Sequence, residues 1–243
     1  MTKRQIGKRG CCCSRRCGFI YQSKQKAAND PDIFELGSDT KYYLLGLLFT
    51  DGNLNKSKDK ITLSLIDEEL IKKLYVIFSD TNKRKIYKQN DNNENHSETY
   101  TIINTNKNTI SKLLEIGLTS NKSLSLEFPE IAKENDKISF IRGIFDGDGS
   151  IYKQTTKSKN REYHYANISF TTGSEKYATG IINCLYELGI HSTLFIDKRK
   201  IKKNCTYYVY IRTKKSVKLF FDLIYNDKTS IYMQRKYLKY LII

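Results

Sequence analysis

Two apolar segments that each end in Asp-Gly constrain this chain more than any other feature. Residues 42–52 read YYLLGLLFTDG, and residues 140–149 read FIRGIFDGDG. Aligned on their central glycines, the copies lie 97 residues apart (148 minus 51), so that glycine meets glycine and Asp-Gly meets Asp-Gly. In a chain of 243 residues this repeat predicts two similar units of ordinary domain size. Two such units favour a molecule with pseudo-two-fold symmetry.

Each segment predicts a helix. Ser38 or Asp39 is a suitable N-cap for a helix that runs to Thr50. Gly52 suits the left-handed position that commonly ends a helix. The second helix is expected over about 136–148.

Glycines in the middle of both helices predict that the helices pack on each other. Gly46 and Gly143 lack side chains, so the two backbones can approach closely there. This packing would place Asp51 and Asp148 side by side at one end. A carboxylate is disfavoured at a helix C-terminus, and two adjacent carboxylates repel. Divalent cations between them would offset both costs, and oxygen ligands suit Mg²⁺. The pair therefore predicts a shared metal site, of a kind that serves phosphodiester hydrolysis.

The second copy offers two aspartates, and the first copy distinguishes them. Asp146 corresponds to Phe49, whereas Asp148 corresponds to Asp51. Two residues also turn a helix by about 200°, so Asp146 is expected to face elsewhere. An ordinary Asp-Gly turn is the alternative explanation for each ending, but its occurrence twice after an apolar helix favours the metal site.

The remaining sequence predicts the same order of helices and strands in each half. Alternating residues predict strands, as in KITLSLI at 60–66, and apolar residues at helical spacing predict helices, as in DEELIKKLYVIF at 67–78. Each half reads helix, strand pair, helix, strand pair, helix, which predicts an α+β fold. The expected divisions are a basic arm over 1–37, a first repeat over 38–136 and a second repeat over 137–243.

The two segments resemble the signature helices of the LAGLIDADG homing endonucleases, in their single-chain, two-motif form. Against the nine-letter signature, residues 44–52 read LLGLLFTDG and residues 141–149 read IRGIFDGDG, where Arg142 is the largest departure. The resemblance covers about 38–243. It implies two pseudo-symmetric αββαββα repeats, with saddle-shaped antiparallel sheets and a central two-helix interface.

The resemblance also implies roles for individual residues. Asp51 and Asp148 would bind Mg²⁺ or Mn²⁺ at the scissile phosphates, with help from the peptide carbonyls of Thr50 and Gly147. The family commonly has one basic residue in each half that polarises the attacking water or steadies phosphate charge. The candidates here are Lys122 and Lys236, with Arg235 and Lys228 as rivals.

Double-stranded DNA is the expected partner, and the net charge of +16 favours a polyanion. In the family fold the concave faces of the sheets lie over the major groove, where strands can read base edges. Exposed polar positions that could make such contacts are Asn53, Asn55, Lys56, Lys58, Ser150, Tyr152, Gln154, Lys198 and Arg199. One chain with internal symmetry is expected to act as a monomer.

The N-terminal residues leave several interpretations open. Residues 1–28 contain eight Lys or Arg and no acidic residue, which fits a DNA-binding arm, a disordered tail or an organelle transit segment. Four of the six cysteines lie here, and Cys13 and Cys17 could form half of a zinc site, although reduced thiols are the simpler interpretation. The cysteine pattern indicates an intracellular protein, cytoplasmic or organellar. No apolar run is long enough to predict a membrane span.

Three functions remain from the sequence. The first is a site-specific double-strand DNA endonuclease, expected to be free-standing or intron-encoded because the chain ends show no splicing-junction residues. The second is a cleavage-inactive LAGLIDADG RNA maturase or DNA-binding regulator. The third is an unrelated basic α+β domain whose Asp-Gly endings are turns. The absence of a GxxxxGK[ST] loop argues against a P-loop ATPase.

Overall fold

The two halves of the chain have the same order of helices and strands. The computed structural model describes residues 28–89, 97–158, 161–197, 205–226 and 231–242. The first repeat is built from α3 (Ser38–Thr50), β1 (Gly52–Leu54), β2 (Ile61–Leu65), α4 (Glu68–Phe78), β3 (Tyr87–Gln89), β4 (Thr99–Asn104) and α5 (Lys107–Glu115). It is preceded by the short 3₁₀ helix η1 (Ile33–Glu35) and followed by η2 (Lys122–Leu124).

The second repeat follows the same plan and then adds a helix. Its elements are α6 (Glu134–Asp148), β5 (Ser150–Ser158), β6 (Arg161–Thr172), α7 (Glu175–Glu187), β7 (Thr193–Asp197), β8 (Thr206–Ile211) and α8 (Lys214–Ile224). The order confirms the predicted αββαββα repeats. The last helix, α9 (Gln234–Leu241), has no counterpart in the prediction.

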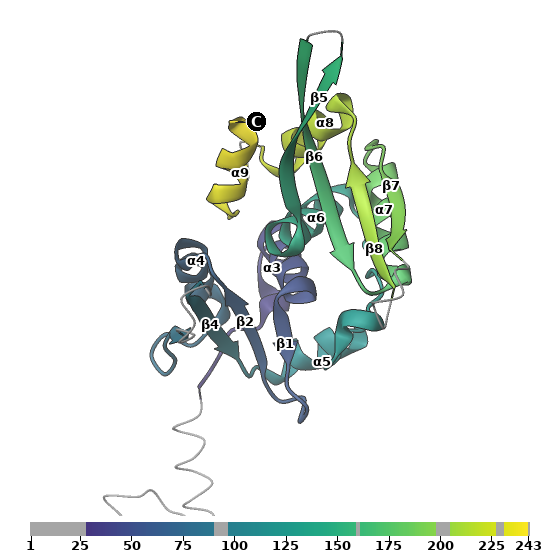
Figure 1. Cartoon of the computed structure of the whole chain (residues 1–243). Coiled ribbons are helices and arrows are strands. Elements are labelled where there is room, and N and C mark those ends of the chain that lie inside the picture. Colours follow the sequence, from purple (N-terminus) through teal and green to yellow (C-terminus); the bar gives the residue numbers. More distant parts are fainter. Residues whose placement is uncertain (1–27, 90–96, 159–160, 198–204, 227–230, 243) are drawn as a thin grey trace, which may run out of the picture.

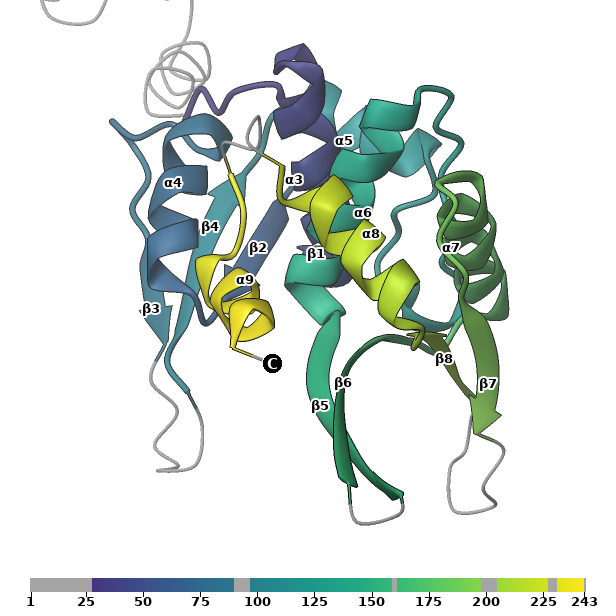
Figure 2. The same ribbon diagram turned by 90° about the horizontal axis from the view of Figure 1, so that it is seen from above.

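Each repeat contains one antiparallel sheet of four strands. The strand orders are β1-β2-β4-β3 and β5-β6-β8-β7, so the two sheets have the same topology. Figure 2 shows both sheets extending from a layer of helices, with α3 and α6 between them. Among the described residues, no helix is both long and apolar enough to cross a membrane.

Every sheet has one apolar face and one polar face, as the alternation of its strands predicts. In the second sheet Ile151 lies opposite Ile168, which in turn lies opposite Ile211, and all three side chains are buried. The neighbouring positions in the same register, Ser150 and Tyr152 on β5, are exposed on the other face. Polar side chains of β5 are therefore exposed on the face opposite to the apolar core.

The central interface is formed by α3 and α6, which lie side by side in Figure 1. A Cβ atom added at Gly46 would come within 2.8 Å of Gly143 Cα and of Ile144 N. A Cβ at Gly143 would in turn come within 2.9 Å of Gly46 Cα. The two backbones are thus in direct contact at the paired glycines, which confirms the predicted two-helix interface.

Arg142, the largest departure from the signature, is buried in this interface. Its guanidinium forms an ion pair with Asp39 at 2.7 Å and lies 5.0 Å from the centre of the Tyr43 ring. Ser139 also donates a hydrogen bond to Asp39, at 2.7 Å. Arg142 therefore links the second motif to the start of the first motif helix.

The prediction that Gly52 adopts a left-handed conformation is wrong. Among the described glycines, only Gly117 and Gly189 have positive φ angles. The helix ends at Thr50, its C-cap Asp51 has φ −95°, and Gly52 is already the first residue of β1. A side chain at Gly52 would overlap the backbone of Leu48, whose Cα would be 2.7 Å from its Cβ. The glycine is needed for close approach, not for its φ angle.

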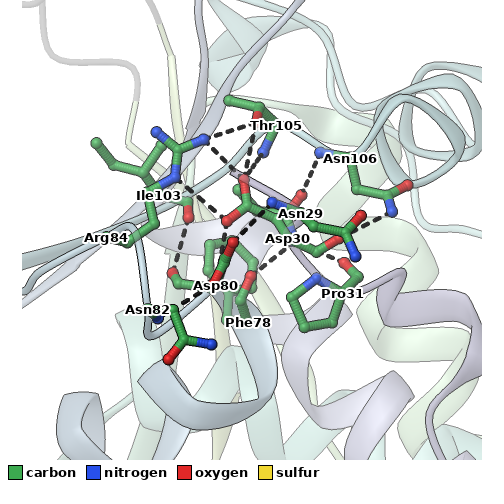
Figure 3. A network of polar contacts seen from close by, with 12 residues as sticks. Asn29, Asp30, Pro31, Phe78, Asp80, Asn82, Arg84, Ile103, Thr105 and Asn106 are labelled. Carbon is green, nitrogen blue, oxygen red and sulfur yellow. Dashed lines mark hydrogen bonds and ion pairs between the residues drawn. The ribbon is translucent and has the colours of Figure 1, made fainter. Parts of the chain in front are cut away.

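Residues 29–36 pack on the first repeat, and Figure 3 shows the polar contacts of Asn29, Asp30 and Pro31. Asp30 is buried, and its carboxylate accepts hydrogen bonds from the backbone N–H groups of Asp80 and Thr105, at 2.9 and 2.8 Å. It also forms an ion pair with Arg84 at 2.8 Å. Ile33 is fully buried in the core. The C-terminal part of the predicted basic arm, from residue 28, is thus packed on the repeat, and residues 1–27, with their four cysteines, lie outside the described residues.

Candidate active site

Asp51 and Asp148 lie together at one end of the central helix pair. Asp51 directly follows α3, and Asp148 is the last residue of α6. A Cβ atom added at Gly147 would be 2.5 Å from Asp51 Oδ2, so the Asp51 carboxylate lies against the last turn of α6. Thr50 Oγ1 donates a hydrogen bond to the same oxygen at 3.0 Å. The glycine at 147 leaves the room that this carboxylate occupies.

Both carboxylates hold their protons more tightly than an ordinary aspartate. Burial, followed by repulsion from Asp148, raises the pKa of Asp51 from 3.8 to about 6. Burial also raises the pKa of Asp148. Asp51 is half-buried and Asp148 is exposed, so solvent screens part of the repulsion between the ionised carboxylates, and a cation bound between them would lower the rest.

Lys122 lies at the C-terminus of the first motif helix. Its ammonium donates a hydrogen bond to the carbonyl oxygen of Leu48 at 2.6 Å, and another to that of Gly52. The residue is presented by η2, which begins after Asn121 in a left-handed conformation, with φ 66°. The Leu48 carbonyl also accepts the N–H of Asp51, so Lys122 is a second donor to it, and a cation is favourable at the C-terminus of a helix.

Lys236 occupies the equivalent position in the second repeat. Its ammonium donates hydrogen bonds to the carbonyl oxygens of Phe145 (2.5 Å), Gly149 (2.6 Å) and Gly147 (3.0 Å). Shifted by 97 residues, Phe145 and Gly149 are the counterparts of the two carbonyls that Lys122 contacts. The predicted pair of lysines is thus arranged with the same pseudo-symmetry as the aspartates.

Both lysines are easier to deprotonate than a lysine in water. Burial lowers the pKa of Lys122 and of Lys236 from 10.5 to about 8, although the two aspartates oppose the shift. Of the two rival cations, Arg235 lies on α9 and points to Asp67, with 3.6 Å between Nε and Oδ2. Lys228 lies outside the described residues.

The donor set fits a hard divalent cation. The structure brings two carboxylates together beside the peptide groups of Thr50 and Gly147, and oxygen atoms of these kinds are the ligands that Mg²⁺ uses. No cluster of three His, Cys, Asp or Glu side chains occurs in the part of the chain that the structure describes. A site for zinc, which prefers nitrogen and sulfur, is therefore not seen among those residues. The Gly147 carbonyl already accepts a hydrogen bond from Lys236, so only its second lone pair is available to a metal.

Replacing Asp51 with Asn is expected to stabilise the metal-free protein at pH 8 by about 1 kcal/mol, after allowance for solvent screening. Because the pKa of Asp51 rises from 3.8 to about 6 on folding, its ionisation opposes folding above pH 6. The advantage of the variant should shrink as the pH falls through 6 and vanish below 4. Thermal unfolding in EDTA across this range measures it. If Mg²⁺ stabilises the variant as much as the wild type, Asp51 is not a metal ligand.

The residues predicted to contact DNA lie in different environments. Asn53 and Lys56 are exposed, and Lys58 is exposed with φ 55°. The Asn55 side chain instead organises the turn between β1 and β2, where it accepts hydrogen bonds from the N–H groups of Asp59 and Lys60 at 3.1 and 3.0 Å. On the second sheet the predicted residues Ser150, Tyr152 and Gln154 follow one another on the polar face of β5, while Lys198 and Arg199 lie outside the described residues.

The polar face of the second sheet also carries aromatic side chains, which are not among the predicted contacts. Tyr208 and Tyr210 lie on one face of β8, stacked with 5.9 Å between ring centres. Phe195 of β7 lies 6.1 Å from Tyr208, and the Arg212 guanidinium lies 4.0 Å from the Tyr210 ring. Pairing of Ser150 with Ser169, and of Ser169 with Tyr210, puts these rings on the face that holds the predicted contacts. The alternation along β8 was the signal that could have found them.

The second repeat matches a known family model. Residues 135–225, which span the second motif helix and its sheet, match the model of the LAGLIDADG-like domain. The first repeat, which lies outside that match, has the same order of elements and the same strand order as the second. The predicted resemblance is thereby confirmed.

Solved structures with the same fold include LAGLIDADG homing endonucleases. The chain is similar to I-SmaMI bound to an uncleaved DNA target in the presence of calcium (TM-score 0.52, 14% identity, 85% of this chain and 89% of that one). It is also similar to mesophilic variants of the homing endonuclease I-DmoI (TM-score 0.52, 14% identity, 84% and 97%). The N-terminal LAGLIDADG domain of DUF199/WhiA has a TM-score of 0.50, at 14% identity over 82% of this chain and 88% of that one.

One curated relative matches by sequence. The replication factor C small subunit of Methanocaldococcus jannaschii is 24% identical over 181 residues, which are 74% of this chain. The match spans only 9% of the length of that relative.

Proposed function

We propose that the protein is a site-specific endonuclease that cuts double-stranded DNA with divalent metal held by Asp51 and Asp148. The observation that carries this proposal is the arrangement of the site. Two carboxylates with raised pKa lie between two lysines that contact equivalent carbonyls of the two motif helices. A duplex has two antiparallel strands related by local two-fold symmetry, and a pseudo-two-fold site presents one equivalent set of groups to each.

The chain's own groups have distinct tasks in this reaction. A bound Mg²⁺ or Mn²⁺ would supply Lewis acidity at the scissile phosphates and a nucleophilic water. Asp51 and Asp148 would hold it, with the Thr50 and Gly147 carbonyls beside them. Lys122 and Lys236 place a positive charge next to each helix end, where it can stabilise negative charge that develops on the phosphate. With pKa values of about 8, both lysines can also exchange protons near neutral pH.

The sheets provide the DNA-binding surface in this proposal. Their polar faces carry side chains that can donate and accept hydrogen bonds, including Asn53 on the first sheet and Tyr152 and Gln154 on the second. The net charge of +16 favours binding to the phosphate backbone. I-SmaMI, which has the same fold, is known in complex with its DNA target. Aromatic and amide groups differ between the two sheets, so the two halves of the target are expected to differ in sequence.

A cleavage assay tests the function directly. The purified chain is incubated with a duplex that rejoins the DNA on either side of its own gene, in Mg²⁺, in Mn²⁺ and in EDTA. We expect a break in both strands with either metal and none in EDTA. Ca²⁺ is the matched control for binding without cutting, since the I-SmaMI complex with calcium holds uncleaved DNA.

The other outcomes are equally informative. If that duplex is not bound, a library of random duplexes selected for binding supplies the target for the same assay. Specific binding without cleavage in Mg²⁺ and Mn²⁺ would overturn the endonuclease and favour a DNA-binding regulator. Selective binding to structured RNA, with no selected duplex, would favour a maturase instead.

A further inference from the structure

Asp146 is buried in the second motif and is not part of the metal site. Its side chain is fully buried, and its carboxylate accepts three hydrogen bonds. The donors are the Tyr43 hydroxyl at 2.8 Å, the Tyr225 hydroxyl at 2.5 Å and the backbone N–H of Met233 at 2.7 Å. Both carboxylate oxygens are thus hydrogen-bonded, which offsets part of the cost of burying the charge, although burial still raises the pKa of Asp146.

The three donors come from three separate parts of the molecule. Tyr43 lies on α3 in the first repeat, Tyr225 directly follows α8, and Met233 directly precedes α9. Their sequence separations from Asp146 are 103, 79 and 87 residues. One carboxylate therefore joins both motif helices to the segment that carries Lys236.

Asp146 is linked to Lys236 through Met233, which lies one helical turn before Lys236. The N–H of Met233 donates to Asp146, and the carbonyl of Met233 accepts the N–H of Lys236 at 3.1 Å. The Lys236 ammonium then returns to α6, on the carbonyls of Phe145 and Gly149. Met233 and Lys236 are both buried, with 1% and 6% of their surface exposed. The first turn of α9 is thus held to α6 at two points.

The first repeat has no such anchor. The counterparts of Tyr43 and Asp146, shifted by 97 residues, are Phe140 and Phe49. Their rings meet edge to face with 5.3 Å between centres, so an aromatic contact replaces the hydrogen bond. Lys122 is presented by η2 and does not depend on this contact. The two halves of the site are therefore positioned by different means.

We propose that Asp146 is a positioning residue that holds the start of α9 and thereby keeps Lys236 on the carbonyls at the end of α6. Loss of the Asp146 carboxylate frees Lys236 and leaves Lys122 in place. Under the proposed nuclease function, on which this second consequence rests, the half of the site that contains Lys236 becomes slow and the other half does not.

Chemical labelling of lysines tests the positioning without DNA. The wild type and three variants (Asp146→Leu, Asp146→Asn and Tyr43→Phe) are treated with a low concentration of acetic anhydride, and acetylation of Lys236 and Lys122 is followed by mass spectrometry. Asp146→Leu removes both acceptor oxygens and with them all three hydrogen bonds, and we expect Lys236 to react about tenfold faster. Asp146→Asn keeps one oxygen for Met233, so the increase should be roughly threefold. Tyr43→Phe keeps the bond to Met233 and should leave Lys236 within about twofold of the wild type.

Lys122 is the internal control in every variant. Its labelling should stay within about twofold of the wild type, which shows that the helix pair remains folded. If Asp146→Leu unfolds the chain, both lysines react quickly, and the comparison of Asp146→Asn with Tyr43→Phe then decides. Two results would overturn the positioning role. One is equal acetylation of Lys236 in Asp146→Asn and Tyr43→Phe. The other is an unchanged rate of Lys236 acetylation in Asp146→Leu while the Lys122 rate also stays unchanged.

A strand-resolved assay tests the consequence for cleavage. With a different label on each strand of the cleaved duplex, Asp146→Leu should slow one strand about tenfold and the other less than about twofold, so that nicked DNA accumulates. Equal slowing of both strands would contradict the assignment to one half. If the wild type cuts no DNA at all, the nuclease function fails, while the labelling result still decides the positioning of Lys236.

Discussion

Asn in place of Asp148 is expected to slow DNA cleavage by a factor on the order of 10³, or about 4 kcal/mol in the barrier. The substitution keeps the shape of the side chain but removes the negative charge that would hold the metal beside Asp51. The polar faces of the sheets and most of the positive charge are unchanged, so binding to the same duplex in Ca²⁺ should stay within about threefold. Cleavage rates under single-turnover conditions and a binding titration measure the two effects separately.

Asp222→Asn is the matched control for Asp148→Asn. Asp222 is exposed on α8, where it forms an ion pair with Lys218 at 2.5 Å, and it takes no part in the helix interface. This variant should cut at the wild-type rate. Cleavage by Asp148→Asn within about tenfold of that rate would show that the metal site is placed wrongly.

Alanine at Gly46 is expected to lower the free energy of unfolding by about 3 kcal/mol. Its Cβ would come within 2.8 Å of backbone atoms of α6, at Gly143 and Ile144, and a backbone cannot rotate away as a side chain can. The two motif helices would have to separate along their length. Because they carry Asp51 and Asp148 at their ends, cleavage should fall together with stability. Urea unfolding measures the loss.

Gly37→Ala provides the control for Gly46→Ala. Gly37 precedes the same helix, and an added Cβ there meets no atom within 4 Å, so the change should cost less than about 0.5 kcal/mol. Alanine at both Gly46 and Gly143 should cost less than the sum of the single changes, because one separation of the helices accommodates both methyl groups. Equal stability of Gly37→Ala and Gly46→Ala would mean that the backbones are not in contact.

Most of the correct predictions about the helix interface and the candidate site come from the repeated motif. Repetition fixed which residues to compare, so the contact of Gly46 with Gly143 and the pairing of Asp51 with Asp148 followed from one alignment. Strand alternation gave the faces of the sheets in the same way. These features are local or periodic, and both kinds of signal are visible along a chain.

The features that could not be predicted depend on contacts between distant residues. Asp30 binds residues 50 to 75 positions away, and nothing in its own segment indicates that residues 29–36 pack on the first repeat. The helical spacing of Asp146 and Asp148 correctly predicts that they face different ways. It does not predict that Asp146 binds Tyr43 on α3 and Met233 before α9, because these residues lie far away in the sequence. Gly52 was misjudged because a glycine after a helix commonly serves a left-handed turn, whereas here the next strand begins at once.

The helix pair has a hydrogen bond between Tyr43 and Asp146 on one side and an aromatic contact between Phe49 and Phe140 on the other. This difference has a consequence for the ancestry of such chains. Pairing two copies of the second repeat would set each Asp146 carboxylate against a Phe140 ring, and pairing two copies of the first would leave each Tyr43 hydroxyl against Phe49. Each self-pairing loses the buried hydrogen bond that the mixed pair forms between Tyr43 and Asp146. A duplicated gene that has diverged in this way can no longer be divided back into two interchangeable subunits.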